Sequence, residues 1–187
     1  MASTTTAGID PRRYDEMDWF AVQVWVGREH ASAEQLRLRG YDVFLPSYQR
    51  HRQWSDRVKK IECALFPGYV FSRANANAAA KIVASPGVLR IVGDGAGPVA
   101  VPMREVDAIR RIVEARLSAE PCEYLCAGQR VCVERGPLRG TKGVVLMLRN
   151  RRRLVVSIPL LQRSVAVEMD ADWLSVPWTP LPDSSVR

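Results

Sequence analysis

Four cysteines and two histidines are the side chains from which a metal or redox centre could be built. Cys122, Cys126 and Cys132 are separated by three and five residues, whereas zinc sites usually contain two pairs of ligands with roughly two to four residues inside each pair. The histidines, His30 and His51, lie far away in the sequence. This spacing favours reduced cysteines that pack as small apolar side chains, so we expect no metal and no cofactor.

The short motifs that mark common enzyme active sites are absent from the sequence. It contains no G-x-x-x-x-G-K-[ST] phosphate-binding loop, no H-E-x-x-H zinc motif and no G-x-S-x-G nucleophile turn. The carboxylates are scattered over predicted helix faces. We therefore expect a protein that is not an enzyme. A basic nuclease or modification enzyme is the alternative, and it would need a divalent metal.

Positive charge is concentrated in two short segments. The chain carries a net charge of +7, and Arg and Lys are dense at positions 50–60 and 149–153. Both segments lie between predicted strands, which is typical of solvated loop tips. They also suit a polyanionic neighbour, because clustered cations displace the counterions of nucleic acid. Trp54 offers a surface on which a nucleobase could stack. The charge pattern leaves both interpretations open.

The first part of the chain alternates between predicted strands and helices. Aromatic and β-branched residues predict a strand at 19–26, and a helix follows at 29–39, ended by Gly40. The clearest helix begins after Pro102, with an apolar stripe at Val106, Ile109, Val113 and Leu117. Further strands are predicted at 41–45, 69–72, 88–92 and 99–101, an extended hairpin at 48–60 and a short helix at 75–84. With helices on one face of a mixed sheet, the fold class is α+β and the architecture an α/β sandwich.

The rest of the sequence predicts only strands. The segments 129–135, 144–148, 153–158 and 164–169 are rich in β-branched residues and are separated by turn residues. Short strands in about 50 residues can bury a core only by curling into a small five-stranded β-barrel. The predicted division is a disordered leader at 1–17, a first domain at 18–118, a linker at 119–126, the barrel at 127–176 and a flexible tail at 177–187.

Neither a membrane segment nor a secretory signal is visible. No stretch approaches about 18 consecutive apolar residues, the length that a membrane-spanning helix needs. The leader at 1–17 has no apolar centre and does not resemble a signal peptide. A cytoplasmic location and no contact with membranes are therefore expected.

Three segments of the first domain resemble the NusG family of transcription elongation factors. They are WFAVQ at 19–23, LFPGYVF at 65–71 and SPGV at 85–88. The pattern G-x-R-V-x-V-x-x-G-P-x-x-G-x-x-G at 128–143 is similar to the KOW motif of the second domain of that family. The resemblance implies an NGN domain that binds RNA polymerase, followed by an SH3-like KOW barrel with Gly136, Gly140 and Gly143 at its turns.

Within the family, three other segments resemble the specialised UpxY branch and its relatives RfaH and LoaP. They are YDVFLP at 41–46, RQWSDR at 52–57 and LLQRSVAV at 160–167. The resemblance implies antitermination or anti-pausing in long operons. The polar residues with which RfaH reads a DNA element are not matched, because those places hold Trp25, Ala31, Gln35 and Leu38.

The resemblance also implies three binding surfaces. An aromatic cavity would grip the clamp helices of RNA polymerase through Trp19, Phe20, Gln23, Phe66, Pro67, Gly68 and Tyr69. A basic surface would lie near upstream or non-template DNA, with the candidates Arg28, Arg50, Arg52, Trp54, Arg57 and Lys59. A barrel loop would recruit termination factor Rho or a small-subunit ribosomal protein through Leu160, Leu161, Gln162 and Arg163, with one of the two leucines buried. A monomer is expected.

Each aromatic residue taken singly is equally well explained as ordinary core. The Phe-Pro-Gly-Tyr element as a unit is harder to explain by packing, because a Pro-Gly break interrupts a strand. Alanine at Phe66 or Tyr69 is therefore expected to weaken polymerase binding while the thermal midpoint stays in place. The alternatives are a general NusG elongation and termination factor, or an RNA-binding or ribosome-associated KOW protein without polymerase contact.

Overall fold

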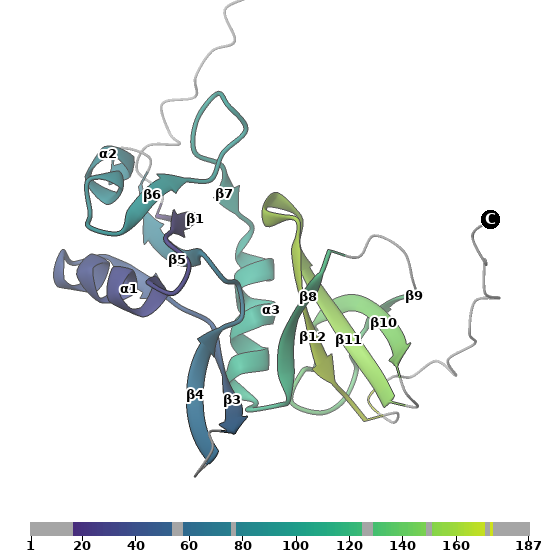
Figure 1. Cartoon of the computed structure of the whole chain (residues 1–187). Coiled ribbons are helices and arrows are strands. Elements are labelled where there is room, and N and C mark those ends of the chain that lie inside the picture. The colour runs from purple at the N-terminus through teal and green to yellow at the C-terminus, as the bar shows by residue number, and fades with distance from the viewer. Residues whose placement is uncertain are drawn as a thin grey trace, which may run out of the picture.

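The structure is a computed structural model, and it describes residues 17–53, 58–75, 78–124, 129–148, 151–170 and 173. Two five-stranded antiparallel sheets, a two-stranded hairpin and three α-helices make up these parts of the chain (Figure 1). None of the described helices is long and apolar enough to cross a membrane. The predicted leader, apart from Met17, and the predicted tail lie outside the described residues.

The first sheet has the strand order β2-β5-β1-β6, and β7 also pairs with β1. All of its pairings are antiparallel. Its strands are β1 (Asp18–Val24), β2 (Asp42–Phe44), β5 (Tyr69–Ala74), β6 (Val88–Ile91) and β7 (Ala100–Val101). Its helices are α1 (Glu29–Leu38), α2 (Ala79–Val83) and α3 (Met103–Glu114). The predicted strands and helices are confirmed close to their predicted bounds, and α2 is shorter than predicted.

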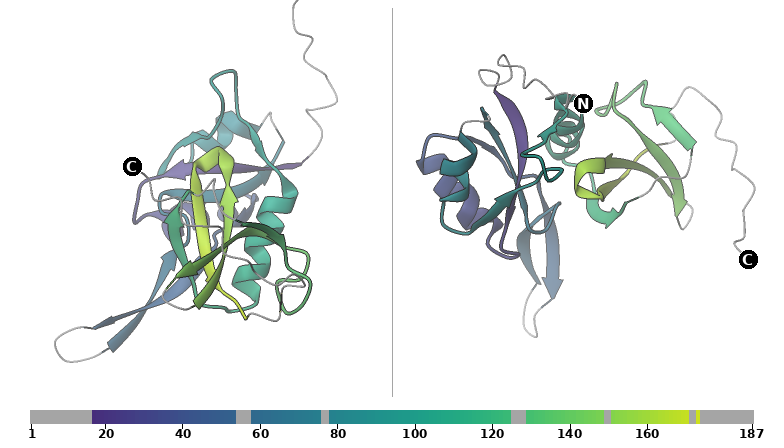
Figure 2. Two further views of the ribbon diagram at one scale, coloured as in Figure 1. Left: turned by 90° about the vertical axis from the view of Figure 1, so that its right-hand side faces the viewer. Right: turned by 90° about the horizontal axis from the view of Figure 1, so that it is seen from above.

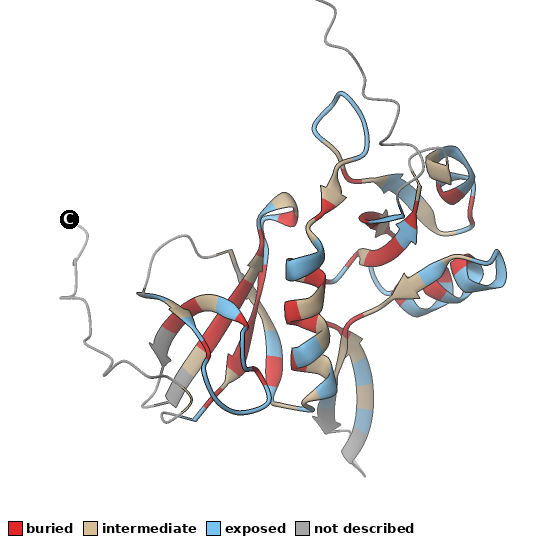
Figure 3. Cartoon of the chain, turned by 180° about the vertical axis from the view of Figure 1, so that it is seen from behind, coloured by how far each residue is buried: buried red, intermediate tan, exposed pale blue. Residues whose placement is uncertain are grey.

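The central strand β1 is buried on both of its faces. Trp19 and Ala21 pack on the side of α3, whereas Phe20 and Val22 pack on the side of α1 and α2. Helices therefore cover both faces of the first sheet (Figures 1 and 3), and the prediction that they lie on one face was wrong. The apolar residues of β1 leave neither side polar, which is the pattern of a strand covered twice.

Helix α3 begins after Pro102 as predicted, and no side chain caps its first turn. Its predicted apolar stripe is confirmed at Val106 and Ile109, which are buried. The helix ends at Glu114, so Leu117 lies beyond it. Ile112 is also buried, which widens the stripe. The wider stripe fits the position of α3 between the two sheets, where it is covered on two sides (Figure 3).

The basic segment forms a hairpin that projects from the first domain (Figures 1 and 2). Its strands are β3 (Ser47–Gln53) and β4 (Val58–Ala64), paired in antiparallel register from Ser47 opposite Ala64 to Gln53 opposite Val58. The predicted hairpin is thus confirmed. The residues at its tip, 54–57, lie outside the described part of the chain.

The second sheet has the order β8-β12-β11-β10-β9 and is antiparallel throughout. Its strands are β8 (Ala119–Glu123), β9 (Gln129–Cys132), β10 (Lys142–Leu148), β11 (Arg151–Ile158) and β12 (Arg163–Glu168). The first of them, β8, lies in the segment 119–126 that was predicted to be a linker. The sequence of β8 hides it because Pro121 interrupts the strand pattern, but an edge strand tolerates proline.

The second sheet packs against the side of α3 that faces away from the first sheet (Figure 2). Buried residues form one continuous apolar core from Trp19 through Ile109 to Leu154. Arg111 Nη1 on α3 donates a hydrogen bond of 3.3 Å to the carbonyl oxygen of Arg139. The two halves of the chain are therefore joined by packing as well as by the short connection between α3 and β8.

Candidate functional site

An aromatic cluster lies between the first sheet and α3. Phe66 and Phe71 meet edge to face with ring centroids 5.6 Å apart, Phe44 lies 6.2 Å from Phe71, and Trp19 lies 6.4 Å from Phe44. Such pairs stabilise a core beyond the area that they bury. The guanidinium of Arg110, on α3, lies 5.5 Å from the ring centroid of Trp19 and 5.4 Å from that of Phe44. A cation therefore covers one side of the aromatic cluster.

The structure does not bring all of the predicted polymerase-binding residues together. Trp19 and Phe66 belong to the aromatic cluster but are only 4% and 1% exposed. Phe20 lies on the opposite face of the sheet, in the core under α1 and α2. Among the predicted set, Pro67 is exposed, and Gln23 and Tyr69 are half-buried. The accessible part of the predicted site is therefore smaller than the sequence suggested, and the buried aromatics form its support.

The Phe-Pro-Gly-Tyr element forms a tight turn that leads into β5. Gly68 has a φ of +82°, a left-handed conformation that favours glycine. Its carbonyl oxygen accepts a hydrogen bond of 2.9 Å from the N–H of Val24, and the N–H of Tyr69 donates one of 3.0 Å to the carbonyl of Phe66. Tyr69 packs against the aromatic side of the core. The Pro-Gly break therefore presents Pro67 at the surface and Tyr69 beside it.

Three residues around the aromatic cluster and this turn were not singled out from the sequence. Arg110 covers the aromatic rings, Arg90 Nε donates a hydrogen bond of 2.7 Å to Gln23 Oε1, and the carboxylate of Glu29 accepts one from Gly68. Each joins elements that are far apart in the chain. The only local signal was the position of Glu29 in the first turn of a helix, where an acidic residue is common without any tertiary role.

The predicted nucleic-acid residues are only partly described. Arg28 and Arg50 are exposed. Arg52 and Lys59 are placed opposite each other on β3 and β4. Trp54 and Arg57 lie outside the described residues. Arg50, Arg52 and Lys59 lie on the strands of the hairpin, whereas the charge pattern suggested loop tips.

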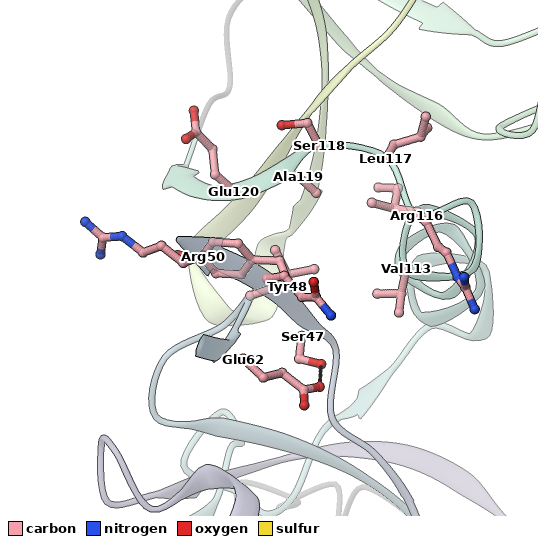
Figure 4. Close-up of a pocket in the computed structure, with 13 residues that line it drawn as sticks. Ser47, Tyr48, Arg50, Glu62, Val113, Arg116, Leu117, Ser118, Ala119 and Glu120 are labelled. Carbon is pink, nitrogen blue, oxygen red and sulfur yellow. Dashed lines mark hydrogen bonds between the residues drawn. The ribbon is translucent and has the colours of Figure 1, made fainter. Parts of the chain in front are cut away.

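A cavity of about 950 Å³ lies between the hairpin base, the end of α3 and β8 (Figure 4). Figure 4 shows side chains from these three elements around it, including Tyr48, Arg116 and Glu120. Arg50 and Arg116 line it together with the carboxylates Glu62 and Glu120. Because its walls mix cations and anions, the charge of this cavity selects no class of ligand.

A smaller cavity, of about 370 Å³, separates α3 from the second sheet. Glu105 and Thr141 line it from opposite sides. The Oε2 atom of Glu105 and the Oγ1 atom of Thr141 are buried and have no hydrogen-bond partner within the described chain. Burial raises the pKa of the Glu105 carboxyl, and the nearby Arg104 opposes this in part. The contact between α3 and the second sheet therefore disfavours an ionised Glu105.

Replacing Glu105 by glutamine should change how the stability of the chain depends on pH. The folded chain holds the Glu105 proton more tightly than the unfolded chain does. Its contribution to the unfolding free energy is therefore complete below the ordinary pKa of 4.5 and is lost as pH rises through the raised value. Relative to the wild-type chain, Glu105→Gln should be more stable near neutral pH than in mild acid. Urea unfolding at both pH values measures this difference.

The control for Glu105 is Glu114→Gln. Glu114 lies on the same helix but is exposed, so its replacement should leave the pH dependence unchanged. An equal pH response of both variants would contradict the role of burial at Glu105.

The glycines of the predicted KOW turn have two different roles. Gly136 and Gly140 have φ values of +75° and +80° and lie in the turn between β9 and β10. A Cβ atom at Gly136 would lie 2.6 Å from the Trp173 ring. Gly143 lies in β10 and not in the turn, because the strand begins at Lys142. There the backbone of β11 approaches so closely that a side chain has no room.

The predicted partner loop joins β11 to β12 through a short 3-10 helix, Pro159–Leu161. Leu161 is buried, and Leu160 is half-buried against the core, so the prediction that one of the two leucines is buried is confirmed. Gln162 adopts a left-handed φ of 51°, and its Nε2 donates a hydrogen bond of 2.8 Å to the carbonyl of Pro159. Gln162 and Arg163 are exposed at the loop surface.

No group of three His, Cys, Asp or Glu side chains that could hold a metal ion occurs in the described parts of the chain. The described cysteines, Cys63, Cys122 and Cys132, lie on three different strands, β4, β8 and β9. Cys126 lies outside the described residues. That the cysteines hold no metal therefore remains a prediction.

A family model described as "Transcription termination factor nusG" matches residues 17–110. Two relatives from two strains of Helicobacter pylori, both named "Transcription termination/antitermination protein NusG", are each 24% identical over 166 residues. These matches cover 82% of this chain and 94% of each relative. The solved structure titled "Domain interaction in Thermotoga maritima NusG" is similar in fold, with a TM-score of 0.53 and 23% identity. The match covers 81% of this chain and 93% of the Thermotoga maritima chain. Because the family model spans half of the sequence, this chain belongs to the NusG family of transcription termination and antitermination factors.

Proposed function

We propose that this chain is a transcription elongation factor that docks on the clamp helices of RNA polymerase through the turn at 66–69. The proposal is carried by the exposed Pro67 and the half-buried Tyr69, which sit at the edge of a buried aromatic cluster. The family match covers this part of the chain. Membership of the family supports the proposal, because its first domain is the part that the resemblance links to polymerase.

A helical partner would find both apolar area and charge at this surface. Tyr69 and Pro67 offer rigid apolar surface, which loses little conformational entropy on binding. Arg90 adds a cation, because it is hydrogen-bonded to Gln23, the residue of β1 that lies opposite Tyr69. We therefore infer that the docked helices present apolar residues flanked by acidic ones. Phe66 anchors the turn in the buried aromatic cluster through its contact with Phe71, and Trp19 belongs to the same apolar core.

Replacing Tyr69 by alanine should weaken binding to RNA polymerase by about tenfold, the loss expected for an interface residue worth about 1–2 kcal/mol. The measurement is a titration of core polymerase with fluorescently labelled full-length chain. Tyr41→Ala is the matched control, because Tyr41 is also half-buried but packs on the opposite core, beside α1 and α2. Equal affinity of the wild-type and Tyr69→Ala chains would remove this surface from the proposal.

The second sheet is, in this proposal, the SH3-like KOW barrel, and it recruits a partner other than RNA polymerase. The exposed Gln162 and Arg163, with the half-buried Leu160, form its contact surface. Its partner is termination factor Rho or a small-subunit ribosomal protein. Titrating the full chain with each of the two in turn would identify which of them binds.

Within the NusG family, we propose that the chain is a specialised antiterminator of the UpxY, RfaH and LoaP kind. In transcription with purified polymerase, such a factor increases readthrough of pause sites and terminators, whereas a general termination factor increases release in the presence of Rho. The names of the Helicobacter relatives include both activities, so this assay decides between them. In this proposal the chain lies in the cytoplasm and acts without a cofactor. Its basic hairpin contacts upstream or non-template DNA.

A further inference from the structure

The first turn of α1 carries a carboxylate that points into the protein. Glu29 is only 6% exposed, although glutamate is almost always a surface residue. Its Oε1 atom accepts a hydrogen bond of 2.8 Å from the N–H of Gly68, which is 39 residues further along the chain. A buried carboxylate is costly unless it is hydrogen-bonded. The long-range bond therefore explains why this acid is tolerated inside.

Gly68 is held from two sides by the same stretch of chain. Glu29 binds its N–H, and the N–H of Val24 binds its carbonyl oxygen at 2.9 Å. A Cβ atom at Gly68 would lie 3.2 Å from Val26 Cγ2, so the peptide also lies close to the loop between β1 and α1. The conformation of the turn is thus set by partners outside it. Glycine alone would not set it, because glycine is the most flexible residue.

The same face of α1 also holds the second Pro-Gly turn. Gly87 has a φ of +83°, and its carbonyl oxygen accepts a hydrogen bond of 3.3 Å from the N–H of Trp25. A Cβ atom at Gly87 would lie 2.5 Å from the Oγ of Ser32. Ser32 is buried and follows Glu29 by one helical turn. The two turns are therefore both packed against buried polar residues of one helix.

We propose that Glu29 is a positioning residue for partner docking: its carboxylate fixes the Phe66–Tyr69 turn in the conformation that presents Pro67 and Tyr69. This inference rests on the proposed function, because it assumes that the turn is the docking surface. Without the carboxylate, the N–H of Gly68 loses its buried acceptor, and an unpaired buried N–H destabilises that conformation. The turn then samples other conformations, and the partner must select the competent one at a cost in affinity.

The test compares three replacements at Glu29 in the full-length chain. Glu29→Gln keeps an oxygen acceptor at the same position, Glu29→Asp withdraws the carboxylate by one methylene, and Glu29→Leu removes the acceptor. Two quantities are measured: the hydrogen-exchange rate of the Gly68 amide by NMR, and the affinity for RNA polymerase. We expect Glu29→Leu to speed Gly68 exchange and to weaken binding, each by about tenfold. Glu29→Gln should restore both to within about threefold of wild type, and Glu29→Asp should lie between them.

Glu34→Leu is the matched control, because Glu34 lies on the same helix and is exposed. It should leave both quantities unchanged. If Glu29→Leu does not fold, the comparison between Glu29→Gln and Glu29→Asp carries the test: glutamine keeps an acceptor within reach of Gly68 but removes the charge, whereas aspartate keeps the charge and withdraws the acceptor.

Two results would overturn the inference, and they are distinguishable. The positioning role alone would be overturned if the wild-type chain binds polymerase and both Glu29→Asp and Glu29→Leu keep normal Gly68 exchange or normal binding. Failure of the wild-type chain to bind polymerase would overturn the proposed function and the docking role of Glu29 with it.

Discussion

Replacing Phe66 by alanine should lower the free energy of unfolding by about 3–5 kcal/mol, the range for large aromatic truncations in a core. Phe66 is 1% exposed and meets Phe71 edge to face at 5.6 Å. Removing its ring takes away apolar burial and leaves a cavity between the first sheet and α3. Urea unfolding followed by tryptophan fluorescence measures the change, and a shift of the midpoint without a change in slope would identify it as a change in stability.

This result would separate two roles that the sequence could not separate. The sequence predicted that Phe66→Ala weakens polymerase binding and leaves the thermal midpoint in place. The burial of Phe66 contradicts the second half of that prediction, because a fully buried ring cannot be removed without loss of stability. Tyr69→Ala is the variant suited to test binding, since Tyr69 is half-buried. A loss below about 1 kcal/mol for Phe66→Ala would show that the ring is not a core residue.

Replacing Gly143 by valine should destabilise the second sheet by about 3 kcal/mol, at the upper end of the usual cost of overpacking. A Cβ atom at Gly143 would lie 2.5 Å from the carbonyl oxygen of Val155 and 3.0 Å from Leu154 Cδ1. The first of these is backbone of the neighbouring strand β11, so it cannot rotate away as a side chain could. The strands β10 and β11 must therefore move apart locally or lose their pairing at this position.

The control for Gly143 is Gly97→Ala. Nothing lies within 4 Å of a Cβ atom at Gly97, and its φ is not in the left-handed region. The Gly97 change should alter the free energy of unfolding by less than about 0.5 kcal/mol. Urea unfolding of both variants gives the comparison. Similar small effects at both positions would mean that β10 and β11 do not approach each other as closely as the structure has them.

Elements with a strong local pattern could be predicted from the sequence. The stripe of Val106 and Ile109 identified α3, and the aromatic and β-branched run at 19–26 identified β1. The glycine pattern at 136 and 140 predicted a turn, and both residues adopt a positive φ there. In each case neighbours in the chain supply the signal, because helix and strand periodicities are local properties.

Elements whose identity depends on distant partners were missed or misplaced. β8 was predicted to be linker, since its short sequence with Pro121 has no strand pattern, and pairing with β12 makes it a strand. Gly143 was placed in a turn, because a glycine that a neighbouring backbone requires looks the same in sequence as one that a turn requires. The sequence predicted all helices on one face of the first sheet. The apolar residues on both sides of β1 indicate that both faces are buried, but they do not indicate which helix packs on which face.

The sequence by itself determined the order of the elements apart from β8, the two Pro-Gly turns and the resemblance to the NusG family that the comparison with known proteins confirmed. Only the tertiary structure decided which aromatic residues support the candidate site and which reach its surface. Trp19 and Phe20 are neighbours in the chain, yet they lie in different cores because successive side chains of a strand point to opposite faces. Likewise, the hydrogen bond of 2.8 Å from the Gly68 N–H to Glu29 forms only on folding, and no local pattern encodes it.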